Sequence, residues 1–403
     1  MDHSANGQGS NSAVVRDYNE RVILAALRRM GEASKADLAR QAGLTQNTAG
    51  QIVRKLAQQQ LVCTVGKRTG ARGQPATMLR LAPEGAYAIG IKLGRRSLDA
   101  LLIDFSGRIL QSRRHEHALP PPETALRLVH EEITGLRAAI PPRARGRLVG
   151  AGLAMPYNIG SWRRELDLSE DLCLAWNGFD LAGQLQRMLD VPVMVENDGT
   201  AVGIAELFTG VGRELDDFLC VFIGTAIGGG LVLGGEYRRG AAGNAADIGL
   251  VPVPPSRLHS APKPTGASDI LLTRASVSSL IRHLVHSGLR IGSRAELEQA
   301  LAIRPPPVED WLADCADALV QPLLATACML DLQAIVIGGD LPDDLVAELI
   351  GRLRHLLVQA VPEAREPPVL VPGTVGRNAA ALGAAILPLH LSYSPARQIL
   401  FGN

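Results

Sequence analysis

Apolar and polar residues alternate at helical spacing through the first sixty residues of the chain. The segment 18–30 repeats its apolar residues every three or four positions, which predicts an amphipathic helix. Ser34 and Asp37 stand three residues apart, as in a capping box, and predict the start of a second helix. Thr45 predicts the cap of a third helix. Two helices joined by a short glycine-containing turn are typical of a helix-turn-helix.

A β-hairpin is predicted to follow the third helix. Two short apolar stretches, 61–62 and 78–81, flank the segment 67–75, which is rich in glycine and arginine. This pattern is typical of the wing of a winged helix. Glycine allows the backbone to approach DNA closely, and Arg68 or Arg72 would enter a narrow minor groove.

Two later segments share one form. Residues 86–110 predict a strand, a turn at Gly94, a second strand, a turn at 106–107 and a third strand. Residues 218–237 repeat this order around the glycine-rich turn 224–230. Each segment opens a series of alternating strands and helices, which is the form of the two lobes of an actin-like (ASKHA) α/β domain. The fold predicted is therefore an N-terminal winged helix-turn-helix followed by a two-lobed actin-like domain.

The predicted domain boundaries follow these patterns. The first segment, rich in Ser, Asn and Gly, predicts a loose tail. The divisions are a tail over 1–13, the winged helix-turn-helix over 14–82, the two-lobed domain over 83–391 with its lobe boundary near 200, and a C-terminal tail over 392–403.

The charge is distributed unevenly along the chain. The 403 residues are 46% hydrophobic and 20% charged, which is typical of a globular protein and excludes disorder for most of the chain. The net charge is only +1, but residues 14–81 hold twelve Lys and Arg against four Asp and Glu, a balance of +8. The later residues 82–403 carry −6. This asymmetry predicts that only the N-terminal segment contacts a polyanion, namely double-stranded DNA.

The third predicted helix begins with short polar side chains that suit the edges of DNA bases, and later residues would continue along a groove or reach phosphates. A three-helix adaptor with a solvated basic loop remains an alternative interpretation of the same segment. The predicted DNA-binding residues are Thr45, Gln46, Asn47, Thr48, Gln51, Arg54, Lys55, Arg68 and Arg72.

The five cysteines form no close pair and no ligand spacing. This predicts a reducing, cytoplasmic environment without disulfides. No charged and then apolar leader with a cleavage site is recognised, so secretion is not expected. The longest uncharged run, 218–235, contains six glycines and predicts two buried strands rather than a membrane span.

Several motifs in the second part of the chain resemble those of the ROK family (repressor, open reading frame, kinase), in its DNA-binding branch of repressors similar to those of xylose and N-acetylglucosamine. Their order and spacing cover about residues 19–389, behind the predicted winged helix. The segments that carry the resemblance are 195–198, 224–230, 239–244, 247–249, 335–339 and 383–387.

The resemblance implies a site between the lobes. In sugar kinases of the family, the acid of the Glu-Asn-Asp motif takes the proton from the attacking sugar hydroxyl, and this position is Asp198. The neighbouring Asn197 would hydrogen-bond a sugar hydroxyl. A carboxylate that only accepts a hydrogen bond, or that only caps the helix predicted near Gly199, is the alternative.

The first phosphate loop departs from the family pattern Asp-x-Gly-Gly-Thr. Here it is the segment 92–96, with Lys92 in place of the aspartate that helps to position magnesium, and with Arg95 and Arg96 where a Gly and a Thr approach phosphate. Phosphoryl transfer needs metal charge and close positioning. The departure therefore predicts that kinase activity is lost, although the cations would still attract an anion.

The family's Glu-x-Gly-His motif is altered too. The glutamate is Asp247, the histidine is Leu250, and no cysteine lies between Cys220 and Cys315. Structural zinc needs four close N or S ligands, so no metal is predicted. Tyr157 replaces a usual glycine and would project into the pocket or lie at the surface. The predicted effector-binding residues are Asn197, Asp198, Asp247, Tyr157 and Asn158.

The function predicted is that of a DNA-binding transcriptional regulator, most often a repressor in this family, acting as a homodimer or homotetramer. A sugar or sugar-like effector would bind between the lobes, and no cofactor is expected. Two alternatives stay open at this point. One is an ATP-dependent sugar kinase with an appended DNA-binding module, and the other is a DNA-binding protein that responds to no ligand.

Overall fold

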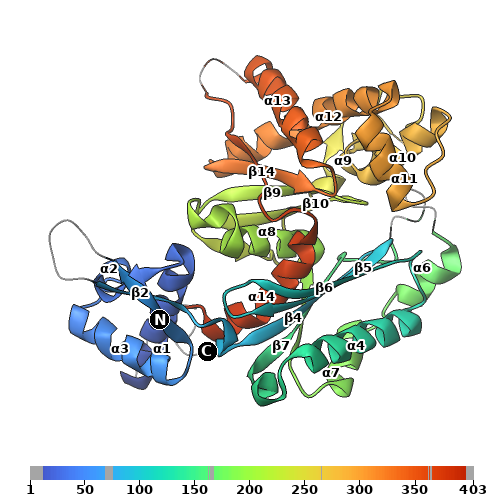
Figure 1. The fold of residues 1–403 in the computed structure, drawn as a ribbon. Helices are drawn as coiled ribbons and strands as arrows, with labels where there is room; N and C mark the ends of the chain where they lie inside the picture. Colours follow the sequence, from blue (N-terminus) through green and yellow to red (C-terminus); the bar gives the residue numbers. More distant parts are fainter. Residues whose placement is uncertain are drawn as a thin grey trace, which may run out of the picture.

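The structure is a computed structural model that describes residues 12–68, 76–161, 163, 168–264, 266–361, 363 and 365–395. It has three parts in chain order, an N-terminal module and two lobes (Figure 1). The predicted tail 1–13 lies outside the described residues except for its last two positions, and the predicted Arg72 lies outside them as well.

The N-terminal module contains the predicted three helices and hairpin. The first helix begins at Ser12, six residues before the predicted start. The predicted capping box of Ser34 and Asp37 begins the second helix, and the Thr45 side chain caps the third. The elements are α1 (Ser12–Met30), β1 (Ala33–Ser34), α2 (Lys35–Gln41), α3 (Gln46–Gln58), β2 (Val62–Arg68) and β3 (Ala76–Leu81).

The first lobe is a mixed five-stranded sheet in the order β6-β5-β4-β7-β8. The β6-β5 and β5-β4 pairs are antiparallel, and the β4-β7 and β7-β8 pairs are parallel. Its elements are β4 (Tyr87–Leu93), β5 (Ser97–Asp104), β6 (Ile109–Glu116), α4 (Pro122–Ala139), β7 (Leu148–Met155), α6 (Glu170–Trp176), α7 (Leu181–Met188) and β8 (Val193–Asn197).

The second lobe repeats this topology in the order β11-β10-β9-β14-β15. Again two antiparallel pairs are followed by two parallel ones, so the predicted repeat of two lobes is confirmed. The elements after β8 are α8 (Asp198–Thr209), β9 (Phe218–Ile223), β10 (Ile227–Leu233), β11 (Glu236–Arg238), β12 (Pro252–Val253), β13 (Asp269–Ile270), α9 (Leu271–Arg274), α10 (Val277–His286), α11 (Arg294–Ile303), α12 (Pro306–Leu330), β14 (Ala334–Gly339), α13 (Asp343–Ala360), β15 (Leu370–Pro372) and α14 (Ala379–Tyr393).

One helix, α12, is long and apolar enough to cross a membrane by length and composition alone. Half of its apolar window is buried inside the second lobe. Its Asp314 accepts hydrogen bonds from the buried Arg274 of α9, at 2.7 and 3.1 Å. These contacts are those of a helix in the core of the second lobe. The uncharged run 218–235 forms β9 and β10, as predicted.

Helices α8 and α14 cross between the lobes. Helix α8 packs on β10 of the second lobe, whereas α14 returns from the second lobe to pack on β4 and β7 of the first. The two helices also pack on each other, and Gly383 of α14 has no room for a Cβ against the carbonyl of Ala201 in α8. Helix α14 ends at Tyr393, so the predicted start of the C-terminal tail at 392 is two residues too early.

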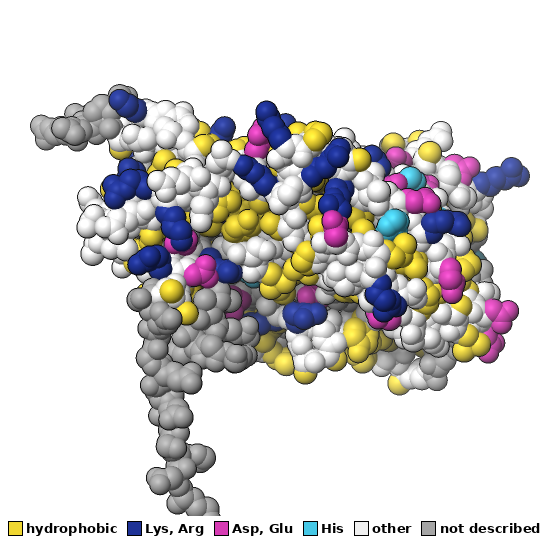
Figure 2. All heavy atoms as spheres, turned by 90° about the horizontal axis from the view of Figure 1, so that it is seen from below, with side chains coloured by type: hydrophobic (Ala, Val, Ile, Leu, Met, Phe, Trp, Pro, Cys, Tyr) yellow, Lys and Arg dark blue, Asp and Glu magenta, His cyan; other side chains and the backbone are white. Residues whose placement is uncertain are grey.

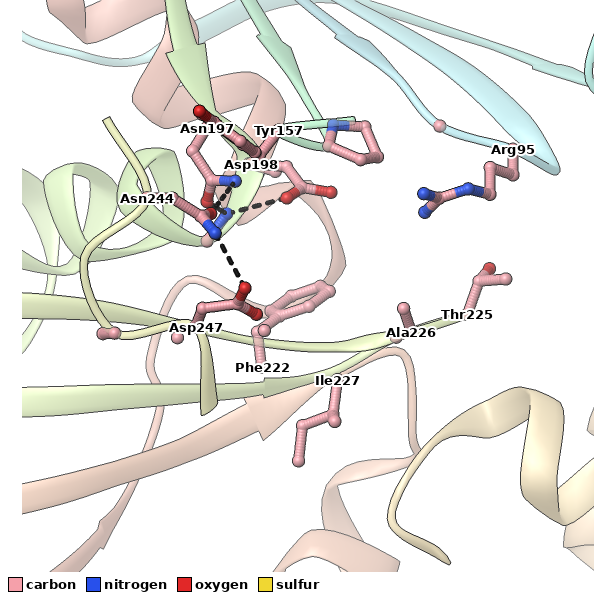
Figure 3. Close-up of a pocket in the computed structure, with 18 of the residues that line it drawn as sticks. Arg95, Tyr157, Asn197, Asp198, Phe222, Thr225, Ala226, Ile227, Asn244 and Asp247 are labelled. Atoms are coloured by element: carbon pink, nitrogen blue, oxygen red, sulfur yellow. Dashed lines mark hydrogen bonds between the residues drawn. The ribbon is translucent and has the colours of Figure 1, made fainter. Parts of the chain in front are cut away.

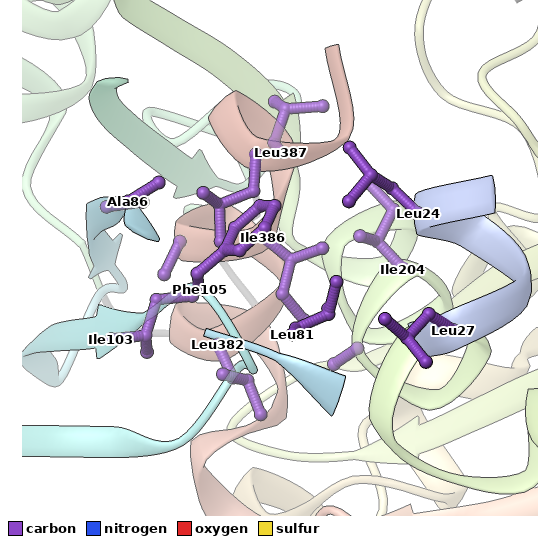
Figure 4. Close-up of a cluster of buried hydrophobic side chains, with 14 of the residues drawn as sticks. Leu24, Leu27, Leu81, Ala86, Ile103, Phe105, Ile204, Leu382, Ile386 and Leu387 are labelled. Carbon is purple, nitrogen blue, oxygen red and sulfur yellow. The ribbon is translucent and has the colours of Figure 1, made fainter. Parts of the chain in front are cut away.

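The N-terminal module shares its hydrophobic core with both crossing helices (Figure 4). Leu24 and Leu27 of α1 belong to the same buried cluster as Ile204 of α8 and Leu387 of α14. Polar contacts add to this packing, since Arg29 of α1 pairs with Asp216 at 2.9 Å. The module therefore packs through α1 on the two lobes, which we call the body, and is not connected to them only by the chain at residue 82.

Candidate functional site

A chain of hydrogen bonds orders the polar side chains at the N-terminus of α8 (Figure 3). The Asn197 amide oxygen accepts from the backbone N–H groups of Gly199 and Thr200, at 2.8 and 3.3 Å. The Asn197 amide N–H₂ donates to Asn244 at 3.2 Å, and Asn244 donates to the carboxylate of Asp247 at 2.7 Å. Asn197 is thus the cap of α8, and its amide group is fixed by its neighbours.

Asp198 is the first residue of α8 and not its cap. One carboxylate oxygen accepts from the N–H of Gly199 at 3.0 Å. Among the described residues the other oxygen has no hydrogen-bond donor, and the carboxylate points into the space between the lobes (Figure 3). The alternative that Asp198 serves as a helix cap is therefore wrong, and its free oxygen is placed to accept a hydrogen bond from a ligand hydroxyl.

These side chains border a cleft of about 440 Å³ between the lobes. The structure places all five predicted effector residues along it, with Asn197, Asp198 and Asp247 on one wall and Tyr157 and Asn158 on the first-lobe side. Tyr157 is 61% exposed. A cleft of this size with a few convergent polar groups is typical of a small-molecule site.

Asn244 and Glu196, which both hydrogen-bond to Asn197, were not among the predicted site residues. Asn244 joins Asn197 to Asp247, and the buried Glu196 accepts from Arg239 at 2.7 Å and from the N–H of Asn197 at 3.0 Å. Burial raises the pKa of Glu196, and the backbone N–H and Arg239 oppose this shift. Both residues lie inside the motifs 195–198 and 239–244, so the motifs themselves carried the signal.

The turn between β4 and β5 places Arg95 opposite Asp198 across the cleft (Figure 3). Arg95 is only 7% exposed. Its guanidinium donates to the carbonyl oxygens of Ile159 and Asn158, at 3.0 and 2.8 Å, and to the Ser161 hydroxyl at 3.4 Å. Burial lowers the pKa of Arg95, and the negative charge of Asp198 opposes the shift. A buried guanidinium therefore fills the space at this turn.

Strand β10, which follows the turn after β9, contains glycines that are needed for packing. A Cβ at Gly230 would strike backbone atoms of Gly199 and Gly203 in α8, and a Cβ at Gly199 would strike Gly229. The glycines let α8 approach β10 closely, which sets the position of Asp198. This finding agrees with the interpretation of the segment as a hairpin of the second lobe.

The described residues contain no group of three or more His, Cys, Asp or Glu side chains that would hold a metal ion. The two histidines near β6 have other partners, since His115 contacts Glu132 at 2.8 Å and His117 contacts the carbonyl of Ala118 at 2.9 Å. The five cysteines are free thiols. Burial raises the pKa of Cys220 and Cys315.

The N-terminal module exposes part of α3. Gln46, Asn47, Gln51 and Arg54 are exposed. Within the described part of the chain, Arg54 makes no ion pair. Thr45 and Thr48 share a hydrogen bond of 2.8 Å between their hydroxyls, so both are already engaged at the helix start. The exposed polar face of α3 thus consists mainly of three amides, Gln46, Asn47 and Gln51, and the cation Arg54.

Other basic residues of the module have partners within the protein. Lys55 pairs with Glu20 of α1 at 2.5 Å, and Arg68 pairs with Asp37 of α2 at 3.1 Å. Both ion pairs would have to loosen before these cations reach a phosphate. Figure 2 views the molecule from below and shows more Lys and Arg than Asp and Glu side chains over the module, at its left side.

Comparison with known proteins gives one family. The profile of the ROK family matches residues 88–390. The xylose repressor of Bacillus subtilis (strain 168) is 25% identical over 244 residues, which cover 60% of this chain and 62% of the repressor.

Two solved structures share the fold. A ROK family transcriptional regulator, a homolog of the Escherichia coli MLC protein, has a TM-score of 0.67 at 19% identity and covers 96% of this chain and 100% of its own. A ROK family glucokinase from Streptomyces griseus, in complex with glucose and AMPPNP, has a TM-score of 0.60 at 24% identity. The glucokinase match covers 75% of this chain and 99% of the enzyme.

Proposed function

Since the chain belongs to the ROK family, we propose that it is a DNA-binding transcriptional repressor whose affinity for its operator is set by a sugar-like effector in the cleft. The observation that carries the proposal is the N-terminal module with its exposed α3. The regulator structure covers 96% of this chain, whereas the glucokinase structure covers 75% and nearly the whole enzyme. A kinase of this fold thus has no counterpart for a quarter of the chain.

In the proposed complex, the start of α3 lies in the major groove as the second helix of a helix-turn-helix. Gln46, Asn47 and Gln51 are amides that form paired hydrogen bonds with adenine edges, and Arg54 reaches a phosphate or a guanine. The β2–β3 hairpin contacts the neighbouring minor groove. A homodimer, or a homotetramer built from two dimers, binds half-sites about 34 Å apart. Such a partner places the protein in the cytoplasm.

In this proposal the protein holds the effector through hydrogen bonds to the hydroxyl groups of the effector. Asn244 and Asp247 present an amide and a carboxylate to the cleft, and Asp198 has a free carboxylate oxygen. These groups accept and donate hydrogen bonds as a neutral polyol requires. Asp198 accepts a hydrogen bond in this account and transfers no proton.

Helix α8 connects the cleft to the N-terminal module. It begins with Asp198, and Phe208 in its last turn contacts Arg28 of α1, whose guanidinium carbon lies 5.7 Å from the centre of that ring. The same carbon lies 5.7 Å from the ring of Phe105 in the first lobe. A ligand that prefers one lobe arrangement therefore moves both rings that hold α1. His390 of α14 completes this cluster, since the centre of its ring lies 4.8 Å from that of Phe208. We call the four residues Arg28, Phe105, Phe208 and His390 the joint.

The DNA-binding part of the proposal is tested by selecting duplexes from a randomised library with the full chain. Affinity is then measured by fluorescence anisotropy at two salt concentrations. Binding through phosphates loses about a hundredfold or more between 50 and 200 mM salt. We expect Arg54→Ala to weaken the selected duplex about tenfold, because a base or phosphate contact is worth about 1–3 kcal/mol.

The matched control is Arg187→Ala, an exposed arginine of α7 outside the module. It is expected to leave the affinity unchanged. Selection of no sequence, or equal loss in both variants, would contradict operator binding through α3.

A sugar kinase is the second candidate, because Asp198 keeps a free carboxylate oxygen in the cleft. The buried Arg95 opposes it, since the turn that would approach a nucleotide phosphate is filled by a guanidinium. An ADP-release assay with magnesium ATP and a hexose panel separates the two. We expect no turnover. Turnover that disappears in Asp198→Asn would replace the repressor proposal with the kinase.

A further inference from the structure

A second cavity of about 530 Å³ adjoins the cleft. It lies between the β5–β6 edge of the first lobe and helices α10 and α11 of the second. The two cavities share Arg95, Thr225 and Asp340 in their walls. One ligand can therefore extend from the cleft into the second cavity.

Positive charge predominates in the second cavity. Four arginines line it, against the acids Glu116 and Asp340. Two of the four are already paired: Arg114 with Asp99 at 3.0 Å, and Arg294 with Glu298 at 2.9 Å. Arg95 and Arg96 make no ion pair with any described residue, and Arg96 is exposed. The two unpaired cations are neighbours in one turn.

Arg95 is the more unusual of the two, because a charged group that is 93% buried normally has a partner of opposite charge. All of its hydrogen bonds go to neutral oxygens, those of Ile159, Asn158 and Ser161. These bonds use its Nε and Nη2 atoms, which leaves the N–H groups of Nη1 free to bind a ligand in the cavities that Arg95 lines.

Two further polar atoms in the wall of the second cavity lack partners. The Nε2 atom of His117 and the hydroxyl of Ser278 are buried, and neither has a hydrogen-bond partner among the described residues. Buried polar atoms are satisfied in most native structures, and each exception needs a cause. An oxygen-rich anion would accept hydrogen bonds from the Ser278 hydroxyl and from the unpaired guanidinium groups together. The His117 ring donates from Nδ1 to the carbonyl of Ala118, and burial lowers its pKa, so its Nε2 is an acceptor and does not contribute to anion binding.

We propose that the second cavity binds the phosphate group of a phosphorylated, sugar-like effector, whose hydroxyls lie against Asn197 and Asp198 in the cleft. The inference rests on the proposed function, because it names the chemical class of the same effector. Guanidinium groups bind phosphate through paired hydrogen bonds and keep their charge at all physiological pH values. Arg95 and Arg96 supply the charge neutralisation, so this binding does not depend on magnesium.

The test measures ligand binding to the full chain in the absence of DNA, so its failure is distinct from a failure to bind an operator. Thermal unfolding and calorimetry compare inorganic phosphate with chloride, and glucose 6-phosphate with glucose, with and without magnesium. We expect inorganic phosphate to stabilise the protein without magnesium, and glucose 6-phosphate to bind at least about tenfold more tightly than glucose, a difference of about 1.4 kcal/mol.

Variants locate the site. Arg96→Gln changes an exposed side chain and is expected to weaken phosphate binding about tenfold, whereas Arg187→Gln on α7 is expected to leave it unchanged. Arg95→Gln should weaken it further, and Arg96→Gln serves alone if the Arg95 variant does not fold.

Three outcomes would overturn the inference. An equal response of wild type, Arg96→Gln and Arg187→Gln would mean an adventitious ion only. A folded wild-type protein that responds to neither inorganic phosphate nor glucose 6-phosphate would exclude the site. Binding of magnesium ATP alone, without the phosphate probes, would point to a nucleotide in this cavity.

Discussion

Two arginines with buried guanidinium groups stand at opposite ends of the proposed signal path, and their surroundings differ. At the cleft, Arg95 donates to three neutral oxygens and borders two cavities. At the joint, both terminal nitrogens of Arg28 are buried and have no hydrogen-bond partner in the described part of the chain, and the guanidinium carbon lies 5.7 Å from the ring centres of both Phe105 and Phe208. Neither arginine has a carboxylate partner among the described residues.

Arg95 can therefore still bind a ligand, whereas the guanidinium of Arg28 is buried against aromatic rings. Burial lowers the pKa of Arg28 to about 10, so the site tolerates the charge at a cost that cation–π contact only partly offsets. Burial also lowers the pKa of Arg95, but Asp198 opposes the shift. We therefore assign ligand binding to Arg95 and transmission to Arg28.

The largest expected effect concerns the pH dependence of the joint. His390 contacts the ring of Phe208 at 4.8 Å, and burial lowers its pKa to about 4. In the unfolded chain it titrates near pH 6.5. Between these values the unfolded state binds more protons, so the free energy of unfolding falls as the pH falls, by about 3 kcal/mol over the whole window.

This effect is measured by chemical denaturation between pH 4 and 7. His390→Phe should reduce the slope, and the part that remains comes from other groups of lowered pKa such as the buried His117 and His283. His355→Gln, at an exposed position, should keep the full slope. A slope that survives unchanged in His390→Phe would show that this histidine is not held neutral at the joint.

Replacement of each arginine by methionine, an unbranched apolar residue, compares the contributions of the two guanidinium groups to stability. Arg95→Met leaves the carbonyl oxygen of Ile159 without a donor, whereas that of Asn158 still accepts from the N–H and the hydroxyl of Ser161, so we expect the free energy of unfolding to fall by about 1–3 kcal/mol. Arg28→Met removes a desolvated charge that makes no hydrogen bond, and should change stability by less than about 1 kcal/mol or raise it. Urea denaturation of both variants is the measurement, and equal losses would break the distinction.

Restoration of the family's phosphate loop tests the role of Arg95 at the cleft, and the expected change in binding free energy is smaller than the largest changes in stability above. The triple variant Lys92→Asp, Arg95→Gly, Arg96→Thr removes three cations and introduces the pattern Asp-x-Gly-Gly-Thr. We expect magnesium ATP to bind at least about tenfold more tightly than to wild type, about 1.4 kcal/mol, and phosphate to bind more weakly. Calorimetry measures both, and wild-type affinity for magnesium ATP equal to that of the variant would contradict the role given to Arg95.

Local signals made much of the fold predictable. The caps of α2 and α3 each depend on side chains within three residues, and the repeated hairpins at Gly94 and 224–230 depend on glycine turns. These features need no knowledge of distant contacts. The start of α1 was missed because the residues before 18 show little apolar periodicity, and none of 13–17 is buried in the structure.

The structure places the predicted effector residues along one cleft, but the hydrogen-bonding role of each residue could not be predicted from the sequence. Adjacent Asn197 and Asp198 are both good helix caps, and only the backbone path decides which one caps α8. The count of basic residues likewise could not show which of them contact other parts of the protein and which are left exposed to DNA. Arg28 and Arg29 face the body, and Lys55 and Arg68 pair inside the module. These assignments depend on long-range contacts that composition does not contain.

The most direct test of regulation through the cleft is the affinity for a selected DNA duplex, measured with and without a ligand found by thermal shift. Wild type is expected to change its affinity at least about tenfold when the ligand saturates the cleft, a coupling of about 1.4 kcal/mol. Arg28→Met should still bind DNA and ligand but lose most of this coupling. A ligand that binds at Asp198 and leaves the DNA affinity of wild type unchanged would contradict the account.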